Sequence, residues 1–225
     1  MRHYAILVAG GSGSRMQSTV AKQFLLLAGK PVLMHTIEAF HKSILNPEIL
    51  VVLDKRQHDY WTELCHIHHF KVSHKIIEGG DQRFHSVKNG LSAIPEDGLV
   101  AIHDAVRPLI SPELITRSYQ EALRNGNCVV AIRPTDSIRR LTGEYQSVAL
   151  NRNDFALVQT PQTFQINQLK QCYEVPYTKA FTDDASVAEF SGIKINIIEG
   201  QRENLKITYP EDLEIAAILL KKRGI

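Results

Sequence analysis

The sequence predicts an α/β fold, a mainly parallel, doubly wound sheet of the Rossmann type with helices on both faces. Two observations predict it. Short apolar runs alternate with amphipathic segments along most of the 225 residues, as in successive βαβ units. The apolar runs are continuous, as expected for strands buried on both faces. No linker or repeat interrupts the chain, so we expect residues 1–225 to form a single domain.

Local patterns place each element in order. Residues 4–9 are apolar and end at Gly10, as a buried parallel strand does. Pro31 opens an amphipathic helix over 31–43, and Ser111 is suited to cap a helix that begins at Pro112. By the same criteria, further strands are expected at 48–53, 72–77, 99–103, 128–132 and 194–199, and further helices at 59–69, 86–94, 112–124, 165–174, 183–191 and 210–222.

Residues 138–148 have the pattern of two short strands about a turn at 142–144. They follow the strand at 128–132 and are more polar than the runs assigned to the sheet. We expect a strand-turn-strand unit here.

Composition excludes several classes of function. The net charge is +2 and the basic residues are scattered, so no nucleic-acid partner is expected. No apolar run reaches the roughly 20 residues that span a bilayer, so no membrane partner is expected. The three cysteines, Cys65, Cys128 and Cys172, are far apart and odd in number. This usage favours the reducing cytoplasm over a disulfide-forming compartment.

The first strand leads into a glycine-rich loop. Gly10, Gly11 and Gly13 let the backbone approach a ligand with its N–H groups, and Arg15 and Lys22 follow on the same connection. A guanidinium binds phosphate through two hydrogen bonds, and a lysine supplies a mobile point charge. The loop therefore predicts a polyphosphate ligand.

Two common phosphate motifs do not fit this loop. No Lys-Ser or Lys-Thr pair follows the glycines, as a P-loop requires. The third glycine of the dinucleotide fingerprint is absent, which argues against an oxidoreductase on the same sheet. Ligands of such sheets bind at the carboxyl ends of the strands. The later loops there, EGGDQR, HDAVRP and RPTDS, combine glycine or proline with charge and extend the predicted site.

Six motifs occur in order along nearly the whole chain: VAGGSGSRM with AKQF, EGGDQRFHSV, HDAVRP, LNRNDFALVQTPQTF, FTDDAS, and ENLKIT with PEDL. Together they resemble the nucleotidyltransferases that join an NTP to a phosphorylated sugar or polyol. Within that group the sequence is similar to the 2-C-methyl-D-erythritol 4-phosphate cytidylyltransferase family of the non-mevalonate isoprenoid pathway. The resemblance implies transfer of CMP from CTP to that polyol phosphate, with release of pyrophosphate and formation of 4-diphosphocytidyl-2-C-methyl-D-erythritol.

The resemblance also implies roles for individual residues. The three cations Arg15, Lys22 and Lys206 would be catalytic. The nucleotide would contact Ala9, Gly10, Gly11, Gly13, Gly80, Asp81, Arg83, Ser86, Asp104 and Ala105. The acceptor would contact Asp104, Arg107, Ser137, Arg152, Thr160 and Thr182.

The same resemblance implies a cofactor and an assembly. A divalent cation, Mg²⁺ or another, would be shared by the triphosphate oxygens, with Asp104 as a possible protein ligand. The two short strands at 138–148 would belong to a small β-arm, inserted at about 135–155, that serves dimerisation. Arg152 would project from this arm into the partner subunit of a homodimer, so that two chains build each active site.

Two other functions stay open at the level of sequence. The Val8-Ala9-Gly10-Gly11 form of the first loop also occurs in relatives that act on ribitol 5-phosphate, which makes a ribitol-5-phosphate cytidylyltransferase the alternative. The FTDDAS and NRNDFALVQTPQ segments favour methylerythritol phosphate as the acceptor. A non-catalytic nucleotide-binding regulator is the alternative of another class. Three cations suited to transition-state charge argue against it.

Overall fold

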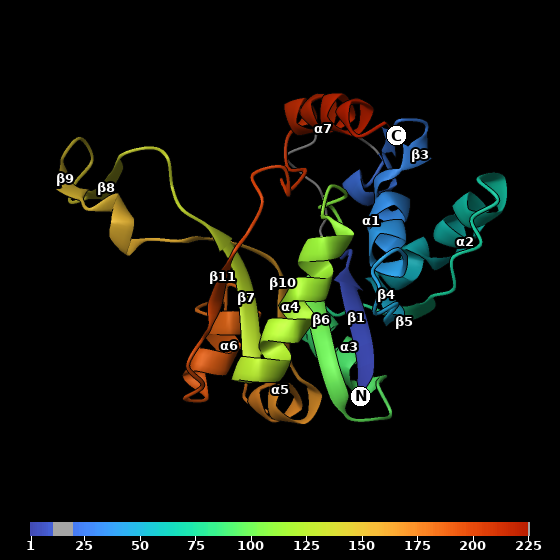
Figure 1. Ribbon diagram of the computed structural model, residues 1–225, viewed down its shortest axis with the longest axis horizontal. Coiled ribbons are helices and arrows are strands. Elements are labelled where there is room, and N and C mark those ends of the chain that lie inside the picture. Colours follow the sequence, from blue (N-terminus) through green and yellow to red (C-terminus); the bar gives the residue numbers. More distant parts are fainter. Residues whose placement is uncertain (11–19, 225) are drawn as a thin grey trace.

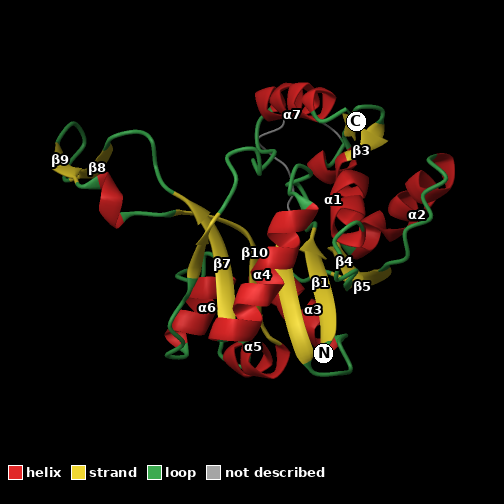
Figure 2. Cartoon of the chain, viewed as in Figure 1, coloured by secondary structure: helices red, strands yellow, loops and turns green. Residues whose placement is uncertain are grey.

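The computed structural model describes residues 1–10 and 20–224. Its centre is a seven-stranded sheet with the order β11-β7-β10-β6-β1-β4-β5 (Figures 1 and 2). The strands are β1 (Arg2–Val8), β4 (Glu48–Leu53), β5 (Lys75–Glu78), β6 (Gly98–Asp104), β7 (Asn127–Ile132), β10 (Leu157–Gln165) and β11 (Ile197–Glu199). The helices are α1 (Val32–His41), α2 (His58–Ile67), α3 (Arg83–Ser92), α4 (Pro112–Asn125), α5 (Ile166–Cys172), α6 (Asp184–Phe190) and α7 (Pro210–Lys222). The mainly parallel α/β fold expected from the sequence is confirmed.

Helices cover both faces of the sheet because the side chains of the central strands alternate between the faces. In β1, Ala5 and Leu7 pack with α1, α2 and α4 in one core cluster. Tyr4 and Ile6, on the opposite face, pack with α3, α5 and α6 in a second cluster. Both clusters are almost free of solvent contact, so the sheet holds the ends of its strands in fixed positions.

The boundaries differ from the expected ones in a few places. β5 begins at Lys75, three residues later than predicted, and α3 begins at Arg83, three residues earlier. The side chain of Ser111 accepts a hydrogen bond from Leu114 N at 3.1 Å, which confirms it as the cap of α4. Among the described residues, no helix combines the length and the apolar character needed to cross a membrane.

The sequence reading missed β10, which lies between β6 and β7 and is antiparallel to both. Pro161 lies within this strand, and a proline normally argues against a central strand because it cannot donate a ladder hydrogen bond. The pairing with β7 shifts register between Val158 and Gln162, and this irregularity accommodates the proline. The segment that reads as a polar loop in sequence is therefore part of the main sheet.

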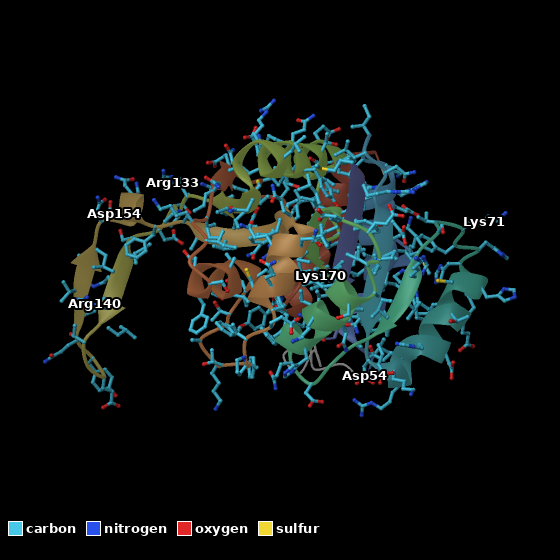
Figure 3. The ribbon with its side chains drawn as sticks, turned by 90° about the horizontal axis from the view of Figure 1, so that it is seen from below. Asp54, Lys71, Arg133, Arg140, Asp154 and Lys170 are labelled. Atoms are coloured by element: carbon cyan, nitrogen blue, oxygen red, sulfur yellow. The ribbon has the colours of Figure 1, made fainter. Side chains whose placement is uncertain are left out.

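Residues 138–150 form a hairpin of β8 (Ile138–Leu141) and β9 (Ser147–Leu150), where the sequence predicts two short strands. A short 3-10 helix, η4 (Arg152–Asp154), follows it. Figure 1 shows the hairpin well away from the main sheet, joined to it by two extended segments. In Figure 3, Arg140 and Asp154 lie on this arm, at the opposite end of the molecule from Lys71.

Smaller elements enclose the carboxyl ends of the parallel strands. They are η2 (Lys22–Phe24), η3 (Lys55–Gln57) and the two-residue strands β2 (Leu26–Leu27) and β3 (Lys30–Pro31). Helix α7 lies beyond this edge of the sheet in Figure 1, and its Ala216 and Leu220 pack against Leu27 and Ile207 in a third cluster. This packing fixes the segment that carries Lys206 above the strand ends.

Candidate active site

A cavity of about 350 Å³ opens at the carboxyl ends of β1, β5 and β6. It is lined by Val8, Ala9, Gly10, Lys22, Gln23, Gly80, Asp81, Gln82, Arg83, Ser86, Asp104, Val106 and Lys206. Most of these residues come from the loops that the sequence singles out as phosphate-binding. We refer to this space as the nucleotide cavity.

A second cavity of about 310 Å³ adjoins the first on the side of β10. It is lined by Arg83, Asp104, Arg107, Val158, Gln159, Thr160, Gln162, Thr182, Asp183 and Lys206. We refer to it as the acceptor cavity. The two cavities share Arg83, Asp104 and Lys206, so ligands in the two spaces would meet at these three side chains.

Asp104 lies at the centre of this boundary. Its Oδ2 atom is 3.1 Å from Lys206 Nζ and 3.1 Å from Arg107 Nε, and its Oδ1 atom is 3.9 Å from Arg83 Nε. Burial alone would raise the pKa of this carboxyl, but the charges of Lys206, Arg83 and Arg107 outweigh burial and hold the pKa well below its usual value. Asp104 is therefore an anion at neutral pH, and it fixes the positions of three cations.

The loop after β5 forms one wall of the nucleotide cavity. Ser86, which is buried, accepts a hydrogen bond from Gly80 N at 3.1 Å and so ties this loop to α3. A Cβ atom at Gly80 would lie 2.4 Å from His85 Cβ, closer than two carbons can approach, so only glycine fits here. Across the cavity, Gln23 donates to Ala9 O at 2.8 Å and fixes the start of the glycine loop.

Two lysines from distant parts of the chain line the nucleotide cavity. Lys22 belongs to η2, and its Nζ donates to the carbonyl of Ile207 at 3.3 Å. Ile207 N in turn donates to Val106 O at 2.9 Å, which ties the segment around Lys206 to the loop after β6. Lys22 and Lys206 thus converge on one space, as the phosphate hypothesis requires.

A buried network forms the floor of the acceptor cavity. Asp104 N donates to Thr160 Oγ1 at 3.1 Å, and Thr160 Oγ1 lies 2.9 Å from His103 Nδ1. Burial lowers the pKa of His103 to about 3, so the ring is neutral at neutral pH. Its Nε2 faces the Arg107 carbonyl at 3.4 Å, which places the ring proton there. The Thr160 hydroxyl consequently donates to His103 and keeps only acceptor capacity toward the cavity.

The structure brings together most, but not all, of the residues predicted for the site. Ala105 lies outside the linings of both cavities; it is fully buried, and its carbonyl accepts from Thr36 Oγ1 at 2.8 Å. Ser137 and Arg152 lie in the exposed arm region and line neither cavity within the one chain. Three further predicted residues, Gly11, Gly13 and Arg15, lie outside the described residues.

Sequence reasoning missed several residues that line the two cavities. The acceptor cavity includes Asp183, whose Oδ2 accepts from Gln162 Nε2 at 2.9 Å. Gln162 also accepts from Ala185 N at 2.8 Å and so links β10 to the start of α6. The alternation of side chains along β10 is the signal that would have found Gln162, had this segment been read as a strand.

The contacts of Asp104 in this structure are with cations of the protein. Lys206 and Arg107 both engage its Oδ2 atom, whereas Mg²⁺ binds through several oxygen ligands at once. Among residues 1–10 and 20–224, no group of three or more His, Cys, Asp or Glu side chains is arranged to hold a metal ion. The described part of the site thus offers cations for phosphates and no carboxylate cage.

The sequence model of the 2-C-methyl-D-erythritol 4-phosphate cytidylyltransferase family (IspD) matches residues 3–222. The chain is 49% identical over 216 residues to the enzyme of that name from Bacteroides fragilis, covering 96% of this chain and 98% of the relative. It is 47% identical over 220 residues to the one from Bacteroides thetaiotaomicron, covering 98% and 100%.

Solved structures agree with this match. The crystal structure of 4-diphosphocytidyl-2C-methyl-D-erythritol synthase from Anaerococcus prevotii superimposes with a TM-score of 0.83 and 27% identity, over 98% of this chain and 96% of that one. The 2-C-methyl-D-erythritol 4-phosphate cytidylyltransferase from Thermus thermophilus gives 0.80 and 28%, over 98% and 100%. The chain belongs to the 2-C-methyl-D-erythritol 4-phosphate cytidylyltransferase family.

Proposed function

We propose that the chain transfers CMP from CTP to 2-C-methyl-D-erythritol 4-phosphate, releasing pyrophosphate and forming 4-diphosphocytidyl-2-C-methyl-D-erythritol. The observation that carries the proposal is the junction of two cavities at Lys206 and Asp104. One cavity is lined by Gly10, Gly80 and Lys22, which suit a nucleotide triphosphate. The other has threonines and Arg107, which suit a phosphorylated polyol.

In the proposed reaction, a phosphate oxygen of the acceptor attacks the α-phosphorus of CTP. A new P–O bond forms there, and the bond to the bridging oxygen of pyrophosphate breaks, with that oxygen taking the electron pair. Two anions must approach each other, so catalysis depends on positive charge placed where they meet. Lys206 borders both cavities and Lys22 borders the nucleotide cavity, which supports these roles for them.

Asp104 has a supporting role in this proposal. Its low pKa keeps it ionised, so it is unsuited to donate a proton at neutral pH. The acceptor phosphate is already an anion and needs no general base. Asp104 instead holds Lys206 and Arg107 side by side at the boundary, where each faces the acceptor cavity.

We propose that Mg²⁺ enters the site bound to the triphosphate rather than to Asp104. Two cations already engage the Oδ2 atom of Asp104, and this supports a nucleotide-borne ion. When bound, the ion would neutralise phosphate charge and strengthen pyrophosphate as a leaving group. Lys22 and Lys206 then supply the protein's share of the positive charge.

We further propose a homodimer in which the arm of one subunit completes the acceptor site of the other. Arg152 and Ser137 are exposed in the arm region, and apolar side chains of the arm such as Leu141 and Tyr145 are 78% and 92% exposed. Exposed apolar surface of this kind is typical of a contact with another chain. The proposed location of the enzyme, the cytoplasm, rests on the cysteine pattern of the sequence.

Subunit mixing tests the shared site. Arg152→Ala and Lys206→Ala would each inactivate the homodimer, but a mixed dimer has one site that carries both changes and one that carries neither. After denaturation and joint refolding, we expect a return of about a quarter of wild-type activity, because half of randomly formed dimers are mixed. Activity that stays at the level of the separate variants would refute the shared site.

One assay decides the reaction and the acceptor. The protein is incubated with Mg²⁺, each of the four NTPs and either methylerythritol 4-phosphate or ribitol 5-phosphate, and pyrophosphate is followed. We expect release only with CTP and methylerythritol phosphate. Faster release with ribitol phosphate would assign the alternative acceptor. No release with any pair, while CTP still binds, would indicate a nucleotide-binding regulator.

A further inference from the structure

Arg83 lines both cavities, yet its strongest contacts point away from them. Its Nη1 and Nη2 atoms donate to the two carboxylate oxygens of Asp184 at 3.0 and 2.6 Å, a bidentate pair between the start of α3 and the start of α6. Its Nε atom lies 3.9 Å from Asp104 Oδ1. The guanidinium is thus held by Asp184, and its Nε atom is on the side of Asp104, at the centre of the site.

Asp184 is fully buried, and its side chain has a third partner. Tyr173 donates its hydroxyl proton to Asp184 Oδ1 at 2.7 Å. Burial and the nearby charge of Asp184 raise the pKa of Tyr173 far above its ordinary value, so the hydroxyl stays protonated and donates. The Tyr173 ring stacks on Phe84 with 4.7 Å between centroids, so its position does not depend on the hydroxyl.

A buried carboxylate is costly unless it is fully paired. A bidentate pair also fixes the plane of the guanidinium, which a single hydrogen bond would not do. Without this anchor, Arg83 could turn and close the 3.9 Å gap to Asp104, where it would compete with Lys206 and Arg107 for the same carboxylate. The acceptor wall would also loosen, since Asp183 lines that cavity next to Asp184.

We propose that Asp184 and Tyr173 are positioning residues: they hold the Arg83 guanidinium as the wall between the two cavities and thereby keep Lys206 paired with Asp104. This inference rests on the proposed cytidylyl transfer. It assigns Arg83 to the boundary between CTP and acceptor rather than to the nucleotide alone. Loss of the anchor should impair turnover and acceptor binding, while binding of CTP alone changes little.

The test compares Tyr173→Phe with Glu174→Gln. Glu174 is the next residue, and it pairs with Lys88 of α3 at 3.4 Å on the exposed surface, so its variant controls for loosening between this segment and α3. For Tyr173→Phe we expect turnover to fall and the acceptor KM to rise, with a combined loss of roughly tenfold in kcat/KM, as for one hydrogen bond to a charged group. The dissociation constant of CTP without acceptor should stay within about twofold.

Asp184→Asn should produce a larger loss in the same direction, provided that circular dichroism shows a folded chain; if it does not fold, Tyr173→Phe decides. The inference is wrong if Tyr173→Phe keeps wild-type kinetics, if it matches Glu174→Gln, or if it weakens CTP and acceptor equally. If the wild-type protein shows no turnover, the proposed function is wrong, and the inference that rests on it is wrong too. If the wild type turns over and Tyr173→Phe behaves like it, only the inference is wrong.

Discussion

Lys206 Nζ and Asp104 Oδ2 lie 3.1 Å apart where the nucleotide and acceptor cavities meet. The lysine side chain is 41% exposed, whereas the aspartate side chain is 11% exposed. The anion is therefore part of the protein framework, and the cation reaches from it into the open site. An incoming phosphate can share the lysine without having to expel the aspartate.

Lys206→Ala should lower turnover by on the order of 10²-fold or more, because it removes a charge at the point where two phosphates meet. The fold should persist, since this side chain is partly exposed. Pyrophosphate release at saturating substrates measures the effect, and Lys222→Ala, an exposed lysine of α7, is the matched control. If turnover of Lys206→Ala stays within twofold of the control, Lys206 has no catalytic role.

Gly80→Ala should weaken CTP far more than the acceptor. The new Cβ atom would lie 2.4 Å from His85 Cβ, so the loop after β5 must move, and this loop lines the nucleotide cavity alone. We expect the KM for CTP to rise by about tenfold or more, in line with a cost of 1–3 kcal/mol for steric overpacking. Gly143→Ala in the arm, where a Cβ atom meets nothing closer than 3.8 Å, is the control. An equal rise in both KM values would contradict this assignment.

Asp104→Asn should reduce turnover without changing the Mg²⁺ requirement. The amide cannot hold Lys206 and Arg107 as a carboxylate does, but on our proposal it removes no metal ligand. The magnesium concentration for half-maximal rate is measured at saturating CTP and acceptor for both proteins. A shift of about tenfold or more would show that Asp104 supports the ion directly, since such losses are typical when metal-site residues are removed.

His103 should make the protein less stable as the pH falls. Burial lowers its pKa in the folded chain to about 3 from an ordinary 6.5, so the unfolded chain takes up a proton below about pH 6.5 that the folded chain does not. From this residue alone the free energy of unfolding should decrease by about 1.4 kcal/mol per pH unit.

Urea unfolding at pH 7, 6 and 5 measures this slope. His35 and His74, whose pKa values burial also lowers, contribute in both proteins. His103→Asn keeps an acceptor for Thr160. Its free energy of unfolding should therefore fall less steeply with pH than that of the wild type, and the difference in slope is the contribution of His103. Parallel pH profiles for the two proteins would show that His103 is protonated in the folded state.

The nucleotide cavity was largely predictable, because clear apolar patterns located the strand-end loops and the family resemblance pointed to individual residues such as Ser86. Lys22, Gly80, Ser86 and Asp104 all line it. Ala105 was predicted beside Asp104, but its side chain is buried. Its backbone N–H donates to Val8 O of β1, and its carbonyl accepts from Thr36 of α1. Neighbours in a strand-end loop can point in opposite directions, and a motif does not say which one faces the ligand.

The acceptor cavity was less predictable. Local patterns hid β10 because of Pro161 and the polar residues around it, so no element was predicted at Gln162. In FTDDAS, Asp183 caps α6, since it accepts from Ser186 N, and it also lines the acceptor cavity. No local signal separates it from Asp184, which is buried against Arg83 from a position 101 residues away in the chain. Such pairing depends on how the layers pack.

The reversed strand β10, inserted between β6 and β7, separates the two walls of the site in the chain, so the specificity of one wall can be altered without the other. On the proposed function, CTP binds in the cavity at the ends of β1, β5 and β6. The opposing wall comes mostly from 158–183, the stretch that contains the reversed strand and the connection after it. The reversed strand β10 pairs with β6 in the sheet, and at the strand ends the two walls meet at the charged groups Arg83, Asp104 and Lys206. Grafting that stretch from a homologue with another polyol preference should redirect the product while leaving cytosine selection intact.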